Sequence, residues 1–266
     1  MVTKRRPSRS KSSLPVALVT GAAHRIGREI ALALANDGYD IAVHYGHSRA
    51  GALATAADVR KAGRRACAVK RDLATQSGVA SLLEHCAGEL GEVTCVVNSA
   101  SLFEYDTALN FDPARLTRHM SVNVAAPLLL ARQLHARIAD GSQGVVINLL
   151  DQKLWNPNPD FLSYTLSKAA LCSATGLLAR ELAPKLRVVG VAPGITLPAP
   201  GQSLRNFEQV SQLTSLGYPS SPQDIAQAVV YLARARAVTG TTLLVDAGQH
   251  LVSSERDVMF LNKAHP

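Results

Sequence analysis

The feature that most constrains the fold of this chain is a regular alternation of short apolar runs with longer amphipathic segments. Runs of four to six mainly apolar residues, typical of buried strands, occupy 16–20, 41–45, 66–70, 95–98, 145–150, 186–191 and 242–245. Segments with helical spacing occupy 25–36, 49–62, 79–90, 113–138, 164–182 and 222–235. Strands separated by helices predict right-handed βαβ units. We therefore expect an α/β fold, a doubly wound parallel sheet of about seven strands in a single domain.

Three segments fall outside this alternation. Residues 1–13 are polar and basic, and we expect them to form a disordered tail before a folded domain at 14–252. Residues 195–219 are the longest stretch without a strand or helix pattern. Because they follow the carboxyl end of a strand, we expect a substrate loop there. Residues 253–266 form a C-terminal tail, and its apolar trio at 259–261 is expected to dock near the active site of a neighbouring subunit.

Charge and composition exclude several classes of protein. The chain has 28 Lys and Arg against 20 Asp and Glu, a net charge of +8, but five of the basic residues lie in the first 13. The remainder has 23 against 20, or +3, which predicts no nucleic-acid-binding face. No apolar run is long enough for a membrane span or follows the basic start as a secretory signal would. The cysteines (Cys67, Cys86, Cys95 and Cys172) form no C-x-x-C pair, so we expect no metal site and a cytoplasmic protein.

A glycine-containing turn opens the first helix. Residues 20–27 read T-G-A-A-H-R-I-G directly after the first predicted strand. Gly21 allows a tight turn, and Gly27 allows the helix to approach the strand. The free N–H groups at the start of the helix are suited to a pyrophosphate. The turn therefore predicts a dinucleotide site.

The end of the second strand indicates which dinucleotide binds. NAD enzymes usually carry an acid there, which binds the ribose 2′-hydroxyl. Here the segment contains His44, Tyr45, His47, Ser48 and Arg49, with no acid. These side chains offer donors to a 2′-phosphate, whereas an acid would repel it. The sequence therefore predicts NADPH/NADP as the cofactor.

A tyrosine and a lysine are placed for proton transfer. Tyr164 and Lys168 are four residues apart, which puts them on one face of a helix. A free tyrosine has a pKa near 10 and is a poor acid or base at pH 7. A neighbouring ammonium group would lower the pKa of Tyr164 toward the working range. We therefore expect this pair to belong to a catalytic site.

Together these residues resemble the short-chain dehydrogenase/reductase family, whose members have the Rossmann fold. The resemblance spans about 16–251 and includes Asp72-Leu73, N-S-A-S at 98–101, Asn123, Y-x-x-x-K and Pro193-Gly194. It implies that Tyr164 delivers a proton, Lys168 binds the nicotinamide ribose, Asn123 holds a proton-relay water, and the protein forms a homotetramer. The implied cofactor contacts are Gly21, His24, Arg25, Ile26, Gly27, His44, Tyr45, His47, Ser48, Asp72, Leu73, Asn98, Ser99, Ala100, Tyr164, Lys168, Pro193 and Gly194.

Two departures from the family pattern narrow the substrate. Arg25 stands at the usual middle glycine of the first turn, and Asp151 stands at the usual catalytic serine, 13 residues before Tyr164. An ionised carboxylate cannot donate a hydrogen bond to a ketone oxygen, but a carboxyl group suits a nitrogen-rich substrate. Both departures resemble the pteridine reductase branch and the bacterial dihydromonapterin and dihydrofolate reductases, as do Ser101 and Phe103. That resemblance implies Asp151 as a further catalytic residue and substrate contacts from Arg25, Ser101, Phe103, Asp151 and Tyr164.

Three functions remain open. The first is an NADPH-dependent reductase that transfers hydride to a C=N bond of a pterin-type substrate, taking a dihydropterin or dihydrofolate to the tetrahydro form. The second is a carbonyl or 3-oxoacyl thioester reductase of the same family, against which Arg25 and Asp151 argue. The third is a non-catalytic NADP-binding redox sensor. The set of Asn123, Tyr164 and Lys168 argues against a sensor, which needs no proton relay.

Overall fold

A seven-stranded sheet runs through the centre of the computed structural model, which describes residues 15–199 and 201–261. Its order is β3-β2-β1-β4-β5-β6-β7, and every neighbouring pair is parallel. The strands are β1 (Val16–Val19), β2 (Asp40–Tyr45), β3 (Ala66–Lys70), β4 (Val93–Asn98), β5 (Gly144–Leu149), β6 (Leu186–Pro193) and β7 (Thr242–Val245). The predicted single-domain Rossmann fold is confirmed, and the strand order reverses between β1 and β4, where such sheets bind ligands.

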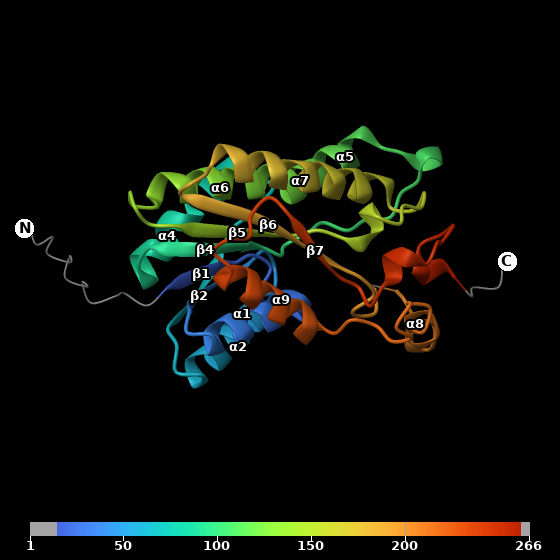
Figure 1. Cartoon of the computed structure of the whole chain (residues 1–266), viewed down its shortest axis with the longest axis horizontal. Coiled ribbons are helices and arrows are strands. Elements are labelled where there is room, and N and C mark those ends of the chain that lie inside the picture. The colour runs from blue at the N-terminus through green and yellow to red at the C-terminus, as the bar shows by residue number, and fades with distance from the viewer. Residues whose placement is uncertain (1–14, 200, 262–266) are drawn as a thin grey trace, which may run out of the picture.

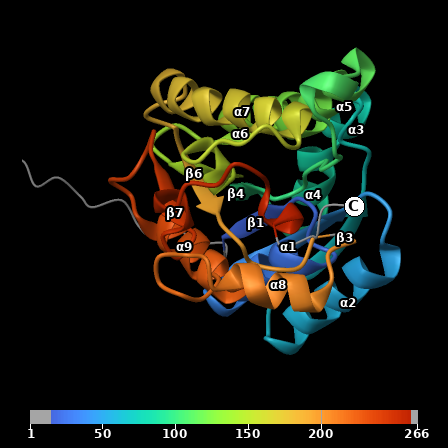
Figure 2. The same cartoon turned by 90° about the vertical axis from the view of Figure 1, so that its right-hand side faces the viewer.

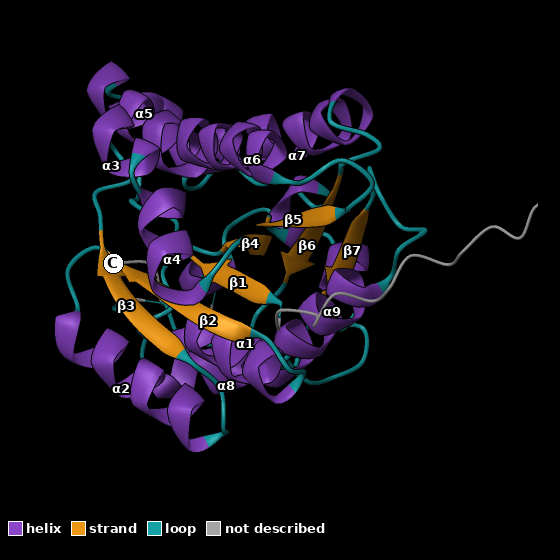
Figure 3. Cartoon of the chain, turned by 90° about the vertical axis from the view of Figure 1, so that its left-hand side faces the viewer, coloured by secondary structure: helices purple, strands orange, loops and turns teal. Residues whose placement is uncertain are grey.

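Helices cover both faces of the sheet (Figures 1 and 3). One layer contains α1 (Arg25–Asn36), α2 (Arg49–Lys61) and α9 (Pro222–Arg234) (Figures 1 and 2). The other contains α4 (Leu82–Leu90), α6 (Ala126–Arg137) and α7 (Leu162–Glu181), with α3 (Gln76–Ala80) and α5 (Pro113–Met120) beside them. Alternate residues of a strand face opposite layers. In β1, Ala17 and Val19 pack toward the first layer, while Val16 and Leu18 pack toward the second. Two cores therefore hold the sheet rigid beneath the site.

The long helix predicted over 113–138 is interrupted. It consists of α5, a π-helical turn η2 (Ser121–Ala125), and α6. Pro127 has no N–H, so it cannot donate to the carbonyl of Asn123 as a regular helix would require, and its ring crowds that carbonyl. The interruption therefore lies at a residue assigned to the proton relay.

The sequence predicts that residues 195–219 contain no helix or strand, and this prediction is wrong. This stretch contains α8 (Leu204–Ser211), which begins where the side chain of Ser203 accepts a hydrogen bond from the N–H of Asn206. The sequence of this helix has no clear apolar stripe, because it buries only Val210 and Ser211. The apolar pattern therefore did not predict the helix. α8 lies beside the last short turn η5 (Val258–Phe260), at the carboxyl end of the sheet (Figure 1).

None of the described helices is both long enough and apolar enough to cross a membrane. The predicted basic tail at 1–13 lies outside the described residues.

Candidate active site

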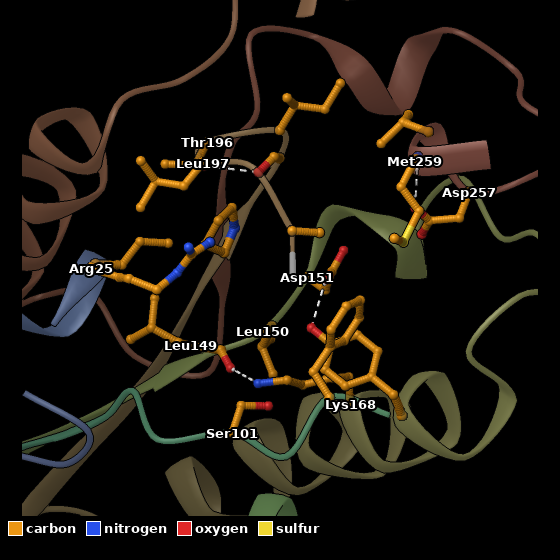
Figure 4. A pocket seen from close by; sticks show the side chains of 18 of the residues that line it. Arg25, Ser101, Leu149, Leu150, Asp151, Lys168, Thr196, Leu197, Asp257 and Met259 are labelled. Carbon is orange, nitrogen blue, oxygen red and sulfur yellow. Dashed lines mark hydrogen bonds between the residues drawn. The ribbon is translucent and has the colours of Figure 1, made fainter. Parts of the chain in front are cut away.

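A cavity of about 280 Å³ opens at the carboxyl ends of the central strands (Figure 4). It is lined by the turn after β1, the segment after β4, the end of β5, α7 and the segment after β6. All five residues predicted to contact substrate line it: Arg25, Ser101, Phe103, Asp151 and Tyr164. Ile26, Ser99, Lys168, Pro193 and Gly194, predicted to contact the cofactor, line it as well. Residues as far apart in the chain as Arg25 and Gly194 therefore meet at one site.

Asp151 and Tyr164 form the centre of the cavity. The phenolic O–H of Tyr164 donates to Oδ2 of Asp151 at 2.7 Å, while Oδ1 of Asp151 accepts from the N–H of Lys153 at 2.8 Å. The second bond caps the short turn η3 (Gln152–Leu154) and fixes the carboxyl group. Asp151 is therefore both a capping residue and the hydrogen-bond partner of the tyrosine.

Burial raises the pKa of both members of this pair. The pKa of the Asp151 carboxyl lies above its ordinary value because desolvation disfavours the carboxylate. Burial, and next the charge of Asp151, raise the pKa of Tyr164 well above its usual range. The expectation that Lys168 would lower it is therefore wrong in this structure. Two anions cannot share a 2.7 Å contact in a buried site, so the pair retains at least one proton.

Lys168 is directed toward the backbone rather than toward the phenol oxygen. Its Nζ donates to the carbonyl of Leu149 at 2.6 Å and lies 5.7 Å from the centre of the Tyr164 ring. Burial lowers the pKa of Lys168 to about 8. The lysine thus holds a positive charge beneath the tyrosine near neutral pH and loses it in mildly alkaline solution.

Asn123 clamps the segment that follows β4. Its Oδ1 accepts from the N–H of Leu102 at 2.8 Å, and its Nδ2 donates to the carbonyl of Leu102 at 3.0 Å and to Oγ of Ser167 at 2.9 Å. These bonds occupy its amide and hold Ser101 and Phe103 at the cavity. The relay water assigned to Asn123 stays a prediction. Because the side-chain amide of Asn123 is engaged and Pro127 cannot donate to its backbone carbonyl, such a water would bind to that carbonyl.

Arg25 adopts a conformation that normally favours glycine. Its φ is 55°, in the left-handed region, which costs a non-glycine residue about 1–2 kcal/mol. The guanidinium lines the cavity and donates to the carbonyl of Pro198 at 2.9 Å. The arginine that replaces the family's middle glycine therefore joins the first turn to the segment after β6 at the cost of backbone strain.

An aromatic group forms one wall. Phe103 stacks on Phe161, with ring centres 4.2 Å apart and planes inclined by 16°, and meets Tyr164 edge-on at 4.7 Å. Phe161 is itself buried. One face of Phe103 is thus supported from below, which fixes an apolar surface beside the proton-donating pair.

A second groove, of about 410 Å³, extends from the first turn to the end of β2. Gly21, with φ 66°, packs so closely on Ala100 that a Cβ would lie 2.9 Å from its Cα, and a Cβ on Gly27 would lie 2.4 Å from the carbonyl oxygen of Gly21. Tyr45, His47 and Ser48 also line the groove. Among the described residues that line it there is no acid.

His24 and Ser48 face each other across this groove, with Nε2 of His24 2.5 Å from Oγ of Ser48. The groove has the shape of a dinucleotide cradle, with donors and no carboxylate at the end of β2. It fits the group that the sequence predicted.

Other predicted cofactor residues lie beneath the grooves. His44 is buried: its Nδ1 accepts from the N–H of Gly21 at 3.2 Å, and its Nε2 faces the carbonyl of Arg71 at 3.1 Å. Burial lowers the pKa of His44 to about 4, so the ring is neutral and supports the turn from inside. Asn98 is also buried and donates to Oδ1 of Asn148 at 2.8 Å.

Asp72 and Leu73 do not line the cavity or the groove. Leu73 is buried, and Oδ1 of the exposed Asp72 accepts from the N–H of Ala74 at 2.9 Å.

The C-terminal segment contributes a wall that the sequence did not assign. Asp257, Val258 and Met259 line the cavity of their own chain (Figure 4), and the expected docking of this segment on a neighbouring subunit stays a prediction. An ion pair holds the segment: Arg256 donates to both carboxylate oxygens of the buried Asp160, at 2.8 and 3.0 Å.

The same carboxylate of Asp160 accepts from the N–H of Asp257 at 2.8 Å. Thr196, Leu197, Ala199 and Gln202, after β6, also line the cavity, and the substrate-binding role expected of this segment stays a prediction. The apolar trio at 259–261 indicated in the sequence that this segment binds to a surface. No feature of the sequence indicated that the surface belongs to the same chain.

The chain matches the family model for short chain dehydrogenases over residues 15–209. It belongs to the short chain dehydrogenase family. An uncharacterized oxidoreductase from Methylorubrum extorquens is 34% identical over 247 residues, which cover 90% of this chain and 99% of the relative. The 3-oxoacyl-[acyl-carrier-protein] reductase FabG of Staphylococcus epidermidis is 28% identical over 240 residues, covering 88% and 98%.

Among solved structures, FolM Alternative dihydrofolate reductase 1 from Brucella suis, in complex with NADP, is 36% identical with a TM-score of 0.87, covering 90% of this chain and 96% of that chain. The family assignment made from the sequence is confirmed.

Proposed function

We propose that this protein is an NADPH-dependent reductase of pterin-type substrates, which converts a dihydropterin or dihydrofolate to its tetrahydro form. The observation that carries the proposal is the hydrogen bond of 2.7 Å between Tyr164 and Asp151, at the position where the family pattern has a serine. A buried carboxyl group with a raised pKa can give a proton to a ring nitrogen or accept one from a ring N–H. A serine hydroxyl can form hydrogen bonds there, but it has no acidity and cannot exchange a proton with the ring nitrogen.

The second groove is proposed to hold NADPH. The close approach of Gly27 to the turn, the donors of His24, His47 and Ser48, and the lack of an acid among the described lining residues support a phosphorylated dinucleotide. When bound, NADPH supplies the hydride. The related Brucella suis structure, which contains NADP, supports the same assignment.

The residues of the main cavity have separate tasks in this proposal. Phe103 offers an apolar surface to a flat ring, and Arg25 offers a cation that can bind the acceptor atoms at its edge. Tyr164 delivers the proton to the nitrogen of the reduced C=N bond, and Asp151 returns one to Tyr164. Lys168, held on the carbonyl of Leu149, keeps a positive charge beneath the Tyr164 ring. Such a complete proton-transfer set supports an enzyme rather than a sensor.

The test is oxidation of NADPH by the purified full chain with dihydrobiopterin, dihydromonapterin, dihydrofolate and acetoacetyl thioester. We expect kcat/KM to be highest for a member of the dihydropterin and dihydrofolate group. A higher value for the thioester, with no turnover of the three pterin compounds, would contradict the proposed substrate class.

A carbonyl or 3-oxoacyl thioester reductase is the second candidate. The similarity to the 3-oxoacyl-[acyl-carrier-protein] reductase of Staphylococcus epidermidis favours it. Asp151 opposes it, because a carboxylate beside the tyrosine would repel the developing alkoxide. The thioester in the same panel distinguishes the two candidates.

We also propose a homotetramer in the cytoplasm. Large apolar side chains are exposed on α7, α9 and β7, namely Leu166, Leu177, Tyr231 and Leu243. Exposed apolar faces of this kind are typical of subunit interfaces. Light scattering of the eluted protein measures the mass, and a monomer would contradict the assembly.

A further inference from the structure

Helix α7, which carries Tyr164 and Lys168, begins without a capping side chain of its own. The residue before it, Phe161, makes no side-chain hydrogen bond to the first turn. Its φ of 56° and ψ of 51° lie in the left-handed region, which is unfavourable for a residue with a Cβ. The N–H groups of the first turn of a helix have no partner within the helix, so buried ones need acceptors from elsewhere. The position of Tyr164, in this first turn, therefore depends on another segment of the chain.

Asp106, 57 positions before Ser163 in the chain, supplies these acceptors. Its backbone carbonyl accepts from the N–H of Leu162 at 3.1 Å, and its Oδ1 accepts from the N–H of Ser163 at 2.9 Å. Its Oδ2 accepts from the hydroxyl group of Ser163. Asp106 and Ser163 are both fully buried, with an exposed fraction of 0%. Because water does not reach these groups to replace the lost bonds, Asp106 holds the first turn of α7 in place.

The same aspartate ends the segment 102–106, which carries Phe103. Asn123 holds the first residue of this segment, and Nε2 of the buried His119 accepts from the N–H of its third residue at 3.3 Å. The bonds to α7 hold its last residue. Phe103 meets Tyr164 edge-on at 4.7 Å. The aromatic wall and the tyrosine are therefore joined by one set of buried hydrogen bonds.

The backbone of Tyr164 is also held on its C-terminal side. Oγ of Ser167 donates to the carbonyl of Tyr164 at 2.6 Å and accepts from Nδ2 of Asn123 at 2.9 Å. Tyr164 thus lies between two buried anchors, one at Ser163 and one at Ser167. The family pattern indicated Asn123, but no motif of the sequence indicated Asp106.

We propose that Asp106 is a positioning residue of this reductase: by anchoring α7 at Ser163, it sets the phenol oxygen of Tyr164 against Asp151. The inference rests on the proposed function, in which Tyr164 delivers the proton. Asp106 is not among the described residues that line the cavity, so it acts through Tyr164. A misplacement of about 1 Å can lower a rate about 10²-fold, and the bond that Asp106 would protect is 2.7 Å long.

The experiment compares two substitutions of Asp106. Asp106→Ala removes both side-chain acceptors. Asp106→Asn keeps an oxygen for the N–H of Ser163 and has an amide that can donate to its hydroxyl oxygen. Asp40→Ala is the matched control, because Asp40 is equally buried and accepts from the N–H of Arg65 at 3.0 Å, but lies at the start of β2, at the opposite end of the sheet. Rates are measured below the lowest melting temperature of the set.

The substrate is whichever compound of the panel the wild type reduces, so that this inference and the proposed substrate class fail separately. Asp106→Ala should lower kcat about tenfold or more. The KM values for NADPH and substrate should stay unchanged, because Asn123 and His119 still hold the segment with Phe103. Asp106→Asn should restore most of kcat, since it can keep the contact with Ser163. Asp40→Ala should lower the melting temperature and leave kcat unchanged.

Tyr164→Phe, measured beside these variants, tests the premise. A lowered kcat in Tyr164→Phe with an unchanged kcat in folded Asp106→Ala would overturn the positioning role and leave the proposed function standing. An unchanged kcat in Tyr164→Phe would overturn both. An equal loss of kcat in Asp40→Ala would assign the effect to stability and also overturn the positioning role.

If Asp106→Ala does not fold, Ser163→Ala takes its place, because it removes only the hydroxyl donor to Asp106 and keeps the N–H bond. This smaller change should lower kcat about threefold, again with both KM values unchanged. An unchanged kcat in Ser163→Ala would then overturn the positioning role.

Discussion

Replacing Asp151 with serine restores the family's usual residue and separates the two candidate substrate classes. Serine is small and polar but has no acidity, so it cannot return a proton to Tyr164. The lost contact is a 2.7 Å hydrogen bond to an ionisable group. Such bonds contribute about 1.5–3 kcal/mol, or roughly 10- to 150-fold in rate. We therefore expect kcat/KM for dihydrobiopterin to fall by at least about tenfold.

Reduction of acetoacetyl thioester should hold or rise in the same variant, because serine restores a hydroxyl donor for a carbonyl oxygen. The substitution also removes the bond from Oδ1 to the N–H of Lys153, which caps η3. Asp112→Ser is a matched control, since Oδ1 of Asp112 accepts from the N–H two residues later, at 2.9 Å, at the start of α5 and away from the cavity. This control should leave both activities unchanged.

The assay is NADPH oxidation followed at several pH values. Asp151 and Tyr164 share a hydrogen bond of 2.7 Å in a buried site, so we expect the pair to titrate as a unit. The pH profile of Asp151→Ser should accordingly move as a whole. Intact pterin reduction together with lost thioester reduction would show that Asp151 is a purely structural cap and takes no part in proton transfer.

Three further outcomes follow from the described contacts. His44 has a pKa of about 4 in the folded protein and 6.5 in the unfolded chain, so the unfolded chain binds more protons between these two values. Lowering the pH from 7 to 5 should therefore reduce the free energy of unfolding by about 2 kcal/mol through this group. Urea unfolding of His44→Gln should lack this pH-dependent component. Arg256→Ala removes two donors from the buried Asp160, so it should lower the melting temperature and raise the substrate KM, while the KM for NADPH stays constant. An unchanged substrate KM would show that the C-terminal segment does not contribute to the substrate site. His47→Glu places an acid after the end of β2 and should narrow or reverse the preference for NADPH over NADH. If the ratio of kcat/KM for NADPH to kcat/KM for NADH stays equal to that of the wild type, the cofactor assignment is wrong.

The sequence predicted those parts of the molecule that depend on local pattern. Alternating apolar runs were enough for the parallel sheet, because each run can bury its side chains only between two helical layers. The spacing of Gly21 and Gly27 correctly indicated a close contact of helix and turn. Asp151 and Tyr164 were expected at one site from the family pattern, and they share a hydrogen bond.

What the sequence missed depends on contacts between distant residues. The pair of Arg256 and Asp160 joins positions 96 apart, and no local pattern indicates that it closes the cavity of its own chain. The direction of the Tyr164 pKa shift was also not predictable, since it depends on the burial of the phenol and on the charge of the neighbouring Asp151.

We propose that this reductase transfers hydride to a pterin ring, with Asp151 and Tyr164 supplying the proton. The most direct test uses NADPH with deuterium at C4 of the nicotinamide, as each stereoisomer in turn, and mass spectrometry of the product formed from dihydrobiopterin. One stereoisomer should give tetrahydrobiopterin with the deuterium bound to a ring carbon. Recovery of unchanged dihydrobiopterin, while acetoacetyl thioester takes up the deuterium under the same conditions, would contradict it.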